Sequence, residues 1–346
     1  MPQFKDVNSI REGLEERECE ILSDIATKAR NSQGRKRPEK ESEIRTCFQR
    51  DRDRILHSKA FRRLKHKTQV FLSPFDDHFR TRLTHTLEVA QIARTISRAL
   101  RLNEDLTEAI SLGHDLGHTP FGHCGEGVLN RLVKGGFRHN EQSVRVVEVL
   151  EDLNLCQETI DGIYTHSWGL SPKSPEAKVV QYADKIAYIN HDIDDSIRAG
   201  MITENDLPKD CQEYFSSNKS KRLTKMITSI IENSMGKPEV SMGEECKEHT
   251  ILLREWMFKN IYIDSPAKKE EKKTAIMVEE LYKHYCKFLS DKVEPEKIDR
   301  IVTDYISGMT DQFATEKFKE IFIPQPMHSI VINDGAILKL INTVKY

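Results

Sequence analysis

An all-α fold is predicted for this chain of 346 residues, because its apolar residues recur at helical spacing along most of its length. Between Leu83 and Leu100 they stand three and four residues apart, as on one face of a helix. Strand-like patterns are confined to two short segments, Thr68–Leu72 and Ser329–Ile332. The chain is long enough to bury a substantial core, so we expect a single domain over residues 1–346.

The further helices begin and end at recognisable signals. Asn103 is a good N-cap, and Ser174-Pro175 combines a cap with a proline at the first helical position. Gly200 ends the helix that starts there. The acidic, irregular segment Gly236–His249 predicts a loop. In chain order, the further expected helices are Asn103–Gly117, Glu141–Leu153, Ser174–Gly200, Arg222–Met235, Thr274–Leu289 and Lys297–Ile321.

Charge is spread unevenly along the chain. The net charge is -2, yet the segment Lys28–Lys67 holds 15 Lys and Arg residues against 5 Asp and Glu residues. A basic segment in a nearly neutral protein favours an anionic ligand or an acidic partner surface. A solvated basic loop around residues 34–38 is the alternative, and the sequence leaves both interpretations open.

The cysteine pattern and the apolar runs bear on the compartment. The 7 cysteines form no CxxC pair, which suits a reducing environment. The first residues lack the apolar core of a signal peptide, and no apolar run approaches the roughly 20 residues that a membrane span needs. We therefore expect a cytoplasmic protein with no membrane partner.

A metal site is predicted around His114 and Asp115, which end an apolar helical run. A buried His-Asp pair is costly unless something binds it. Imidazole nitrogen and carboxylate oxygen are both ligands of first-row metals. His85 and Asp184 stand at helical positions on either side and complete a pattern of four candidate ligands.

A glycine- and proline-rich loop follows this pair and carries candidate acid-base groups. His118, His123 and Glu126 lie on it, and imidazole titrates near neutrality. Glu126 is placed to hold one ring nitrogen of His123, and His139 is a weaker candidate. We assign no function to the other histidines, which are His57, His66, His78, His166, His191, His249, His284 and His328.

The predicted helix Ser174–Gly200 carries a polar stripe along one face, with Lys185 beside it. The opposite face is apolar, so the stripe faces either solvent or a cavity, and both readings stay open. The members of the stripe are Asp184, Tyr188, Asp192 and Asp195, and the apolar residues opposite are Ile186, Ile189 and Ile193.

Four long segments resemble the dNTP triphosphohydrolase family of deoxyguanosinetriphosphate triphosphohydrolase-like proteins, within the HD superfamily. They begin FQRDRDRILHSKAFRRLKHK, GGFRHNEQSV, YADKIAYINHDIDD and DYISGMTDQF, and with gaps they stretch across residues 48–322. The resemblance implies an HD-domain helical fold with minor short strands and a metal-binding core over residues 80–200. The tail, residues 325–346, lies outside it, and its role is not assigned.

The resemblance also implies roles for individual residues. Its catalytic histidine and supporting acid match His123 and Glu126, and its further active-site histidines match His118 and His139. The implied reaction converts a dNTP into a deoxynucleoside and intact tripolyphosphate. The implied metal ligands are His85, His114, Asp115 and Asp184; the implied substrate-binding residues are Arg82 and Lys185 for the triphosphate, Tyr188 under the deoxyribose, and Asp192 and Gln69 at the 3′-hydroxyl.

The cofactor expected from the resemblance is a divalent metal, with Mn²⁺ or Mg²⁺ favoured and Fe, Ni, Zn or Co as alternatives. The expected partners are the dNTP substrate, further copies of the chain in a tetramer or hexamer, and an allosteric nucleotide or single-stranded DNA. One rival function is an HD phosphohydrolase on a smaller nucleotide, such as a 5′-nucleotidase or phosphodiesterase. Another is a nucleotide-sensing or single-strand-binding protein on the same fold. The loop histidines argue against the first rival, and the intact ligand set argues against the second.

Overall fold

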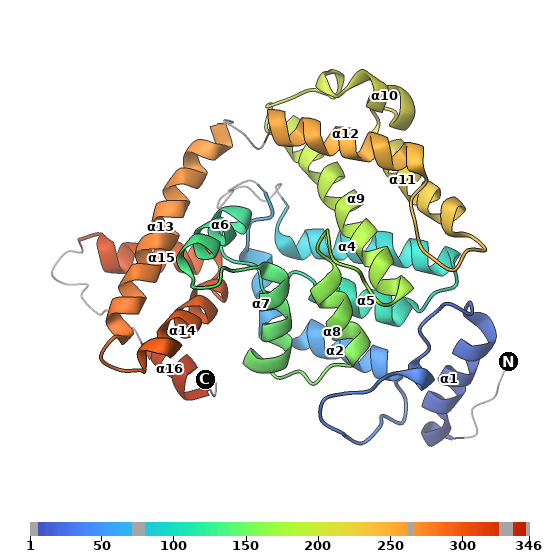
Figure 1. Cartoon of the computed structure of the whole chain (residues 1–346), viewed down its shortest axis with the longest axis horizontal. Helices are drawn as coiled ribbons and strands as arrows, with labels where there is room; N and C mark the ends of the chain where they lie inside the picture. The colour runs from blue at the N-terminus through green and yellow to red at the C-terminus, as the bar shows by residue number, and fades with distance from the viewer. Residues whose placement is uncertain (1–5, 71–79, 262–265, 325–334, 344–346) are drawn as a thin grey trace. The chain divides into compact units, whose positions relative to one another are not determined.

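The fold is helical in the computed structural model, which describes residues 6–70, 80–261, 266–324 and 335–343 (Figure 1). Over these ranges the all-α prediction is confirmed, since no strand forms. Thr68 and Thr81 form one isolated antiparallel bridge, and residues 68–70 form no longer strand. The second predicted strand, Ser329–Ile332, lies outside the described residues.

The chain divides into two compact units. Unit 1 comprises residues 1–58, 84–114 and 153–265, and unit 2 comprises residues 59–83, 115–152 and 266–346. A single domain over residues 1–346 remains a prediction. The helices of unit 1 are α1 (Ile10–Ile21), α2 (Cys47–His57), α4 (Arg82–Ala99, whose first two residues belong to unit 2), α5 (Glu104–Gly113), α8 (Gln157–Thr165), α9 (Pro175–Arg198), α10 (Lys209–Phe215), α11 (Lys219–Ser234) and α12 (Glu244–Asn260). Those of unit 2 are α3 (Lys59–Arg63), α6 (Gly122–Leu132), α7 (His139–Arg145), α13 (Pro266–Leu289), α14 (Pro295–Ser307), α15 (Asp311–Phe322) and α16 (Gly335–Thr343).

Helix α5 forms the centre of unit 1, where it packs against α2, α8 and α9. Its apolar residues are buried, and its predicted cap is present, because the Asn103 side chain accepts a hydrogen bond from the Leu106 amide. A Cβ atom at Gly162 of α8 would lie 2.4 Å from Cδ1 of Ile110. Glycine at this position therefore lets α5 and α8 approach closely.

Helix α13 has the corresponding role in unit 2 and packs against α6, α14 and α15. Val278, Leu281 and Tyr285 are fully buried in this core. Ile337 of α16 is buried in the same core, so part of the segment predicted as an unassigned tail contributes to packing.

Two predictions about the C-terminal half are wrong. The expected helix Lys297–Ile321 is two helices, because α14 ends at Ser307 and the Thr310 side chain caps a new helix by accepting from the Phe313 amide. The expected loop Gly236–His249 is helical from Glu244, where acidic residues in the first turn of α12 suit the helix dipole.

Two helix boundaries near the predicted metal pair also differ from expectation. Helix α5 ends at Gly113 rather than Gly117, so the segment from His114 onward turns away from it. The helix expected over Glu141–Leu153 begins earlier, at His139, and continues from α7 into a π-helical turn at Val146–Leu150. The hydrophobic pattern alone cannot distinguish these variants of helical geometry.

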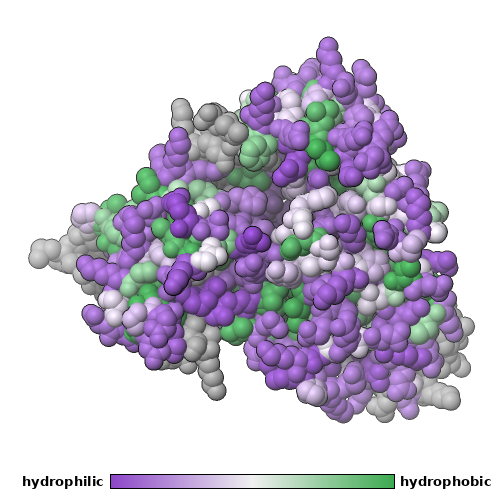
Figure 2. All heavy atoms as spheres, viewed as in Figure 1, coloured by the Kyte–Doolittle hydropathy of each residue, from purple (hydrophilic) through white to green (hydrophobic). Residues whose placement is uncertain are grey.

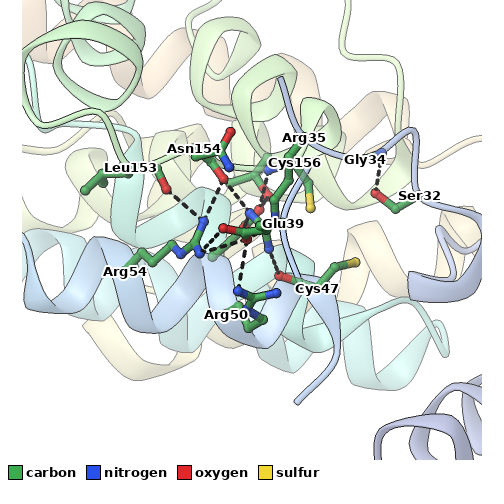
Figure 3. Close-up of polar contacts among 12 residues, drawn as sticks. Ser32, Gly34, Arg35, Glu39, Cys47, Arg50, Arg54, Leu153, Asn154 and Cys156 are labelled. Atoms are coloured by element: carbon green, nitrogen blue, oxygen red, sulfur yellow. Dashed lines mark hydrogen bonds and ion pairs between the residues drawn. The ribbon is translucent and has the colours of Figure 1, made fainter. Parts of the chain in front are cut away.

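The basic segment around residue 35 is anchored rather than fully solvated (Figure 3). Arg35 forms an ion pair with Asp51 of α2, whose side chain is 0% exposed. Its guanidinium also donates to the backbone oxygens of Cys47, at 2.8 Å, and Asn154, at 2.6 Å. Glu39 contacts Arg35 at 2.9 Å, so this network ties the segment to α2 and to the residues before α8.

The surface is mostly hydrophilic on the face shown in Figure 2, with hydrophobic residues in separate small groups. Among the described residues, no helix combines the length and the apolar character that crossing a membrane requires.

Arg35→Met is expected to lower the free energy of unfolding by about 3 kcal/mol, because it leaves the buried Asp51 carboxylate without its cation. Urea unfolding at neutral pH measures this loss. The control is Lys36→Met at the exposed neighbouring position, which we expect to change stability by less than about 0.5 kcal/mol. Equal losses in the two variants would contradict an anchoring role for Arg35.

Candidate active site

Three predicted metal ligands converge within unit 1. His85 lies on α4, His114 directly follows α5, and Asp184 lies on α9. Nε2 of His85 is 3.0 Å from Oδ1 of Asp184, and Nε2 of His114 is 3.8 Å from the same oxygen. Both imidazoles are buried, with side chains 1% exposed. Asp115 is the next residue after His114 and belongs to unit 2.

The surroundings of Asp184 favour its charged form. Burial alone would raise the pKa of this carboxyl, but the hydrogen bond with His85 and the charges of nearby imidazoles lower it to about 2. Two imidazole nitrogens and one carboxylate oxygen are a donor set that suits Mn, Fe, Zn and related divalent ions. The residues present therefore fit a divalent metal.

Two histidines without an assigned function in the sequence analysis lie beside these groups. The His166 ring lies 5.0 Å from the His114 ring, centroid to centroid. Nδ1 of His191 is 3.4 Å from Nδ1 of His85, and its Nε2 is 2.6 Å from the Glu88 carboxylate. His191 stands seven residues after Asp184, two helical turns along the same face, and this spacing is a signal that could have identified it. No comparable signal marks His166.

In unit 2, Glu126 lies between His123 and His139. The loop predicted for His123 and Glu126 is wrong at this point, because both residues lie on α6, and His139 is the first residue of α7. One carboxylate oxygen is 3.2 Å from Nδ1 of His123, and the other is 2.8 Å from Nδ1 of His139. Burial opposes its ionisation, but these two hydrogen bonds outweigh burial and hold its pKa well below the usual range. Burial would lower the pKa of His139, but the hydrogen bond with Glu126 and the charge of that carboxylate raise it. The His123 side chain is 76% exposed, so most of its ring is accessible from solvent.

His118 occupies a different environment from its neighbours. It is buried and stacks on His139 with the ring centroids 4.2 Å apart. Burial and the nearby positive charges of Arg82 and His139 hold its pKa well below the usual value. This histidine is therefore neutral at physiological pH and can donate or accept a hydrogen bond without carrying charge.

Arg82 is a buried cation in unit 2. Its Nη1 donates to Oδ2 of Asp115 at 2.7 Å, and its side chain is 1% exposed. Its Nε and Nη2 atoms are buried and make no hydrogen bond among the residues that the structure describes. A Cβ atom at Gly122 would lie 3.2 Å from Nη2. Two unused guanidinium donors in a buried place suit a bound anion.

The loop that follows Asp115 is held by hydrogen bonds between its backbone and side chains of unit 2. Lys67 is 1% exposed, and its ammonium donates to the backbone oxygens of His118 and Ser307. The Gly117 amide donates to the Ser143 hydroxyl at 2.9 Å. A Cβ atom at Gly117 would lie 2.2 Å from the Ser143 backbone nitrogen, so only glycine fits.

The remaining predicted substrate residues are divided between the units. Gln69 is buried in unit 2, and its backbone oxygen lies beside Gly122. Helix α9 of unit 1 carries three of them, Lys185, Tyr188 and Asp192. Asp192 is 2% exposed. The stripe on this helix is therefore not a fully solvated acidic face.

Lys185 and Tyr188 each contact a side chain from outside α9. Nζ of Lys185 lies 3.6 Å from the centroid of the Trp168 ring, a cation–π arrangement. Burial and the charges of Arg254 and Lys247 lower the pKa of Lys185 to about 8. The Tyr188 hydroxyl accepts a hydrogen bond from Nε of Arg254 at 2.9 Å. Arg254 and Trp168 were not singled out from the sequence, because only folding places them beside α9.

Comparisons with known proteins match two family models and several curated relatives to this chain. The family model described as HD domain matches residues 82–189, and the one described as phosphohydrolase-associated domain matches residues 240–320. A deoxyguanosinetriphosphate triphosphohydrolase-like protein of Caldanaerobacter subterraneus subsp. tengcongensis is 58% identical over 92% of this chain and 97% of its own length. Proteins of the same description from Clostridium perfringens and Desulfatibacillum aliphaticivorans are 48% and 46% identical, over 91% and 92% of this chain and 98% and 99% of their own lengths. A solved structure of a hypothetical protein from Aquifex aeolicus, 21% identical, covers 79% of this chain and 71% of its own, with a TM-score of 0.47.

Gly117→Ala is expected to destabilise the protein by about 1–3 kcal/mol, because the added methyl group would meet the backbone of α7. Thermal unfolding measures the effect. Gly127→Ala is the matched control, since a Cβ atom there has nothing within 4 Å and alanine favours the helix. A Gly117 variant as stable as the Gly127 variant would show that the loop does not depend on this close approach.

Proposed function

This chain belongs to the family of deoxyguanosinetriphosphate triphosphohydrolase-like proteins, and we propose that it hydrolyses deoxynucleoside triphosphates to deoxynucleoside and tripolyphosphate in a metal-dependent reaction. The family places it among the HD-domain phosphohydrolases. The observation that carries the finer proposal is the set of two buried imidazoles, His85 and His114, beside the partly buried Asp184, whose donor atoms suit a divalent ion. The family resemblance adds Asp115 as the fourth ligand.

The metal, when bound, would be held by His85, His114, Asp115 and Asp184 and would polarise the α-phosphate as a Lewis acid. The triphosphate carries about four negative charges at neutral pH, so it requires further cations. Arg82 supports this role because two of its guanidinium nitrogens are buried without a hydrogen bond among the described residues. Lys185 supplies a second positive charge at the phosphates.

His123 is the proposed proton donor. Hydrolysis joins a water oxygen to the α-phosphorus and breaks the bond to the 5′-oxygen, which must take up a proton as it leaves. Glu126 holds Nδ1 of His123, which orients the ring and leaves Nε2 for the leaving oxygen. The exposed position of His123 leaves this nitrogen accessible to a bound nucleotide. His118 and His139 complete the polar surroundings of the phosphates.

The sugar is proposed to lie along α9. Tyr188 is one helical turn beyond Asp184, and Asp192 is one turn beyond Tyr188. A nucleotide with its α-phosphate at Asp184 would therefore extend its sugar along this face. The Tyr188 ring would pack under the 2′ carbon, and Asp192 with Gln69 would bind the 3′-hydroxyl.

Other properties are proposed from the family resemblance. They are a cytoplasmic homo-oligomer, either a tetramer or a hexamer, an allosteric nucleotide or single-stranded DNA as activator, and Mn²⁺ or Mg²⁺ as the metal. Hydrolysis of a smaller nucleotide remains the rival activity, and the products distinguish it.

Incubating the purified protein with each dNTP and Mn²⁺ or Mg²⁺, and then resolving the products, tests the activity directly. We expect deoxynucleoside and tripolyphosphate, with no turnover after chelation. Asp184→Ala should lose both bound metal and turnover, because an incomplete ligand set cannot hold the ion. Pyrophosphate with a dNMP, or orthophosphate with a dNDP, would refute the proposal and favour another nucleotide hydrolase.

His123→Ala is expected to lower kcat by about 10²–10⁴, the usual contribution of a general acid, while metal content stays unchanged. Glu126→Ala should act in the same direction with a smaller loss. Steady-state kinetics with metal analysis measure both effects. Loss of nucleotide binding with normal turnover at saturation would assign His123 to binding instead.

Tyr188→Ala is expected to narrow the preference for dGTP over GTP while it lowers the overall rate. The wild-type ring leaves no room and no partner for a 2′-hydroxyl, and a buried unpaired hydroxyl is strongly disfavoured. The ratio of kcat/KM for dGTP and GTP in both proteins measures the preference. Equal use of the two nucleotides by the wild-type enzyme would rule out this form of sugar selection.

A further inference from the structure

We propose that Glu88 and His191 together orient the metal-binding imidazole of His85 and fix which of its ring nitrogens carries hydrogen. The inference rests on the proposed function, because it concerns the same metal site. It assigns positioning roles to two residues that the sequence analysis did not include in the site.

The three side chains form a continuous series within unit 1. Nε2 of His191 is 2.6 Å from a carboxylate oxygen of Glu88. Nδ1 of His191 is 3.4 Å from Nδ1 of His85, with the two rings nearly perpendicular at 88°. Nε2 of His85 in turn lies 3.0 Å from Oδ1 of Asp184. The series thus runs from the edge of the protein, where the Glu88 side chain is 39% exposed, to the buried imidazole.

Hydrogen-bond chemistry fixes the direction of this series once Nε2 of His85 binds a cation. Its Nε2 must then present a lone pair, so the hydrogen of the neutral ring lies on Nδ1. That hydrogen points to Nδ1 of His191, which must accept it. The hydrogen of the neutral His191 ring therefore lies on Nε2, where the Glu88 carboxylate accepts it. Each position in the series has a matching partner.

The two helices supply these groups from different directions. Glu88 stands three residues after His85 on α4, so both lie on one face, and His191 reaches between them from α9. A carboxylate that holds the far nitrogen of an imidazole is the usual outer support of a metal-bound histidine. Here a second imidazole is inserted between the two.

A simpler role is also available to the pair, as an ion pair that braces α4 against α9. A partly exposed ion pair contributes little to stability, with or without metal. The two roles differ in one measurable respect. A brace changes the stability of the metal-free and metal-loaded protein alike, whereas an orienting role changes metal affinity.

The test measures Mn²⁺ affinity of the full-length protein by competition with a chelator, together with melting temperatures in EDTA and in Mn²⁺. We expect Glu88→Ala and His191→Ala to weaken Mn²⁺ binding by about 10–100-fold, the usual effect of removing an outer support. The melting temperature of each variant in EDTA should stay close to that of the wild type. The rise in melting temperature when Mn²⁺ is added should be smaller than in the wild type. The double variant should bind Mn²⁺ no more weakly than His191→Ala alone, since Glu88 acts through His191.

A conservative variant and a matched control sharpen the result. Glu88→Gln keeps an oxygen that accepts a hydrogen bond, so it should bind Mn²⁺ more tightly than Glu88→Ala does. Asp194→Asn removes a different ion pair of α9, the 2.8 Å contact with Lys219 of α11, and should leave Mn²⁺ affinity unchanged. If His191→Ala fails to fold, the partly exposed Glu88 variants decide the question.

Unchanged Mn²⁺ affinity in the Glu88 variants, or equal losses of melting temperature with and without metal, would overturn the inference. Asp184→Ala separates this failure from failure of the proposed function. If Asp184→Ala loses Mn²⁺ while the Glu88 variants keep it, the metal site stands and only the orienting role is wrong. If the wild type binds no Mn²⁺, or Asp184→Ala binds it normally, the proposed function itself fails.

Discussion

The partly buried carboxylate of Asp184, beside two buried imidazoles, is the constraint around which unit 1 is organised. An ionised carboxylate removed from water costs several kcal/mol unless charge or hydrogen bonds compensate it. His85 and His114 provide that compensation at 3.0 and 3.8 Å, so α4, α5 and α9 must converge at this point. The glycine contact between α5 and α8 supports the convergence, because it lets α5 sit deep in the unit.

In unit 2, the buried charged groups are compensated by different partners. Glu126 is held by two imidazoles, and Arg82 is paired with Asp115, yet two of the Arg82 guanidinium nitrogens make no hydrogen bond among the described residues. Lys67 is used structurally, since its ammonium holds backbone oxygens of the loop and of α14. Unit 2 therefore contains the proposed proton donor and a buried cation, while unit 1 contains three of the proposed metal ligands.

The histidines of unit 2 differ in their chemistry because they lie in different environments. His123 is exposed and held by a carboxylate, His118 is buried and neutral, and His139 has its pKa raised by Glu126. Similar side chains close together in sequence thus acquire distinct properties, because burial and neighbouring charge act on each differently. The same reasoning applies to His191, because its proposed positioning role depends on its contacts with Glu88 and His85.

The sequence by itself determined the helical class, the capped starts of α5 and α9 and the candidate metal residues, because apolar periodicity, capping and ligand chemistry are local properties. It did not determine the break between α14 and α15 or the helical start at Glu244, where short local signals compete with the hydrophobic pattern. Only the tertiary structure placed Arg254 against Tyr188, Trp168 under Lys185 and Glu88 against His191. Contacts between helices depend on how the helices pack, and no spacing along one segment encodes that packing.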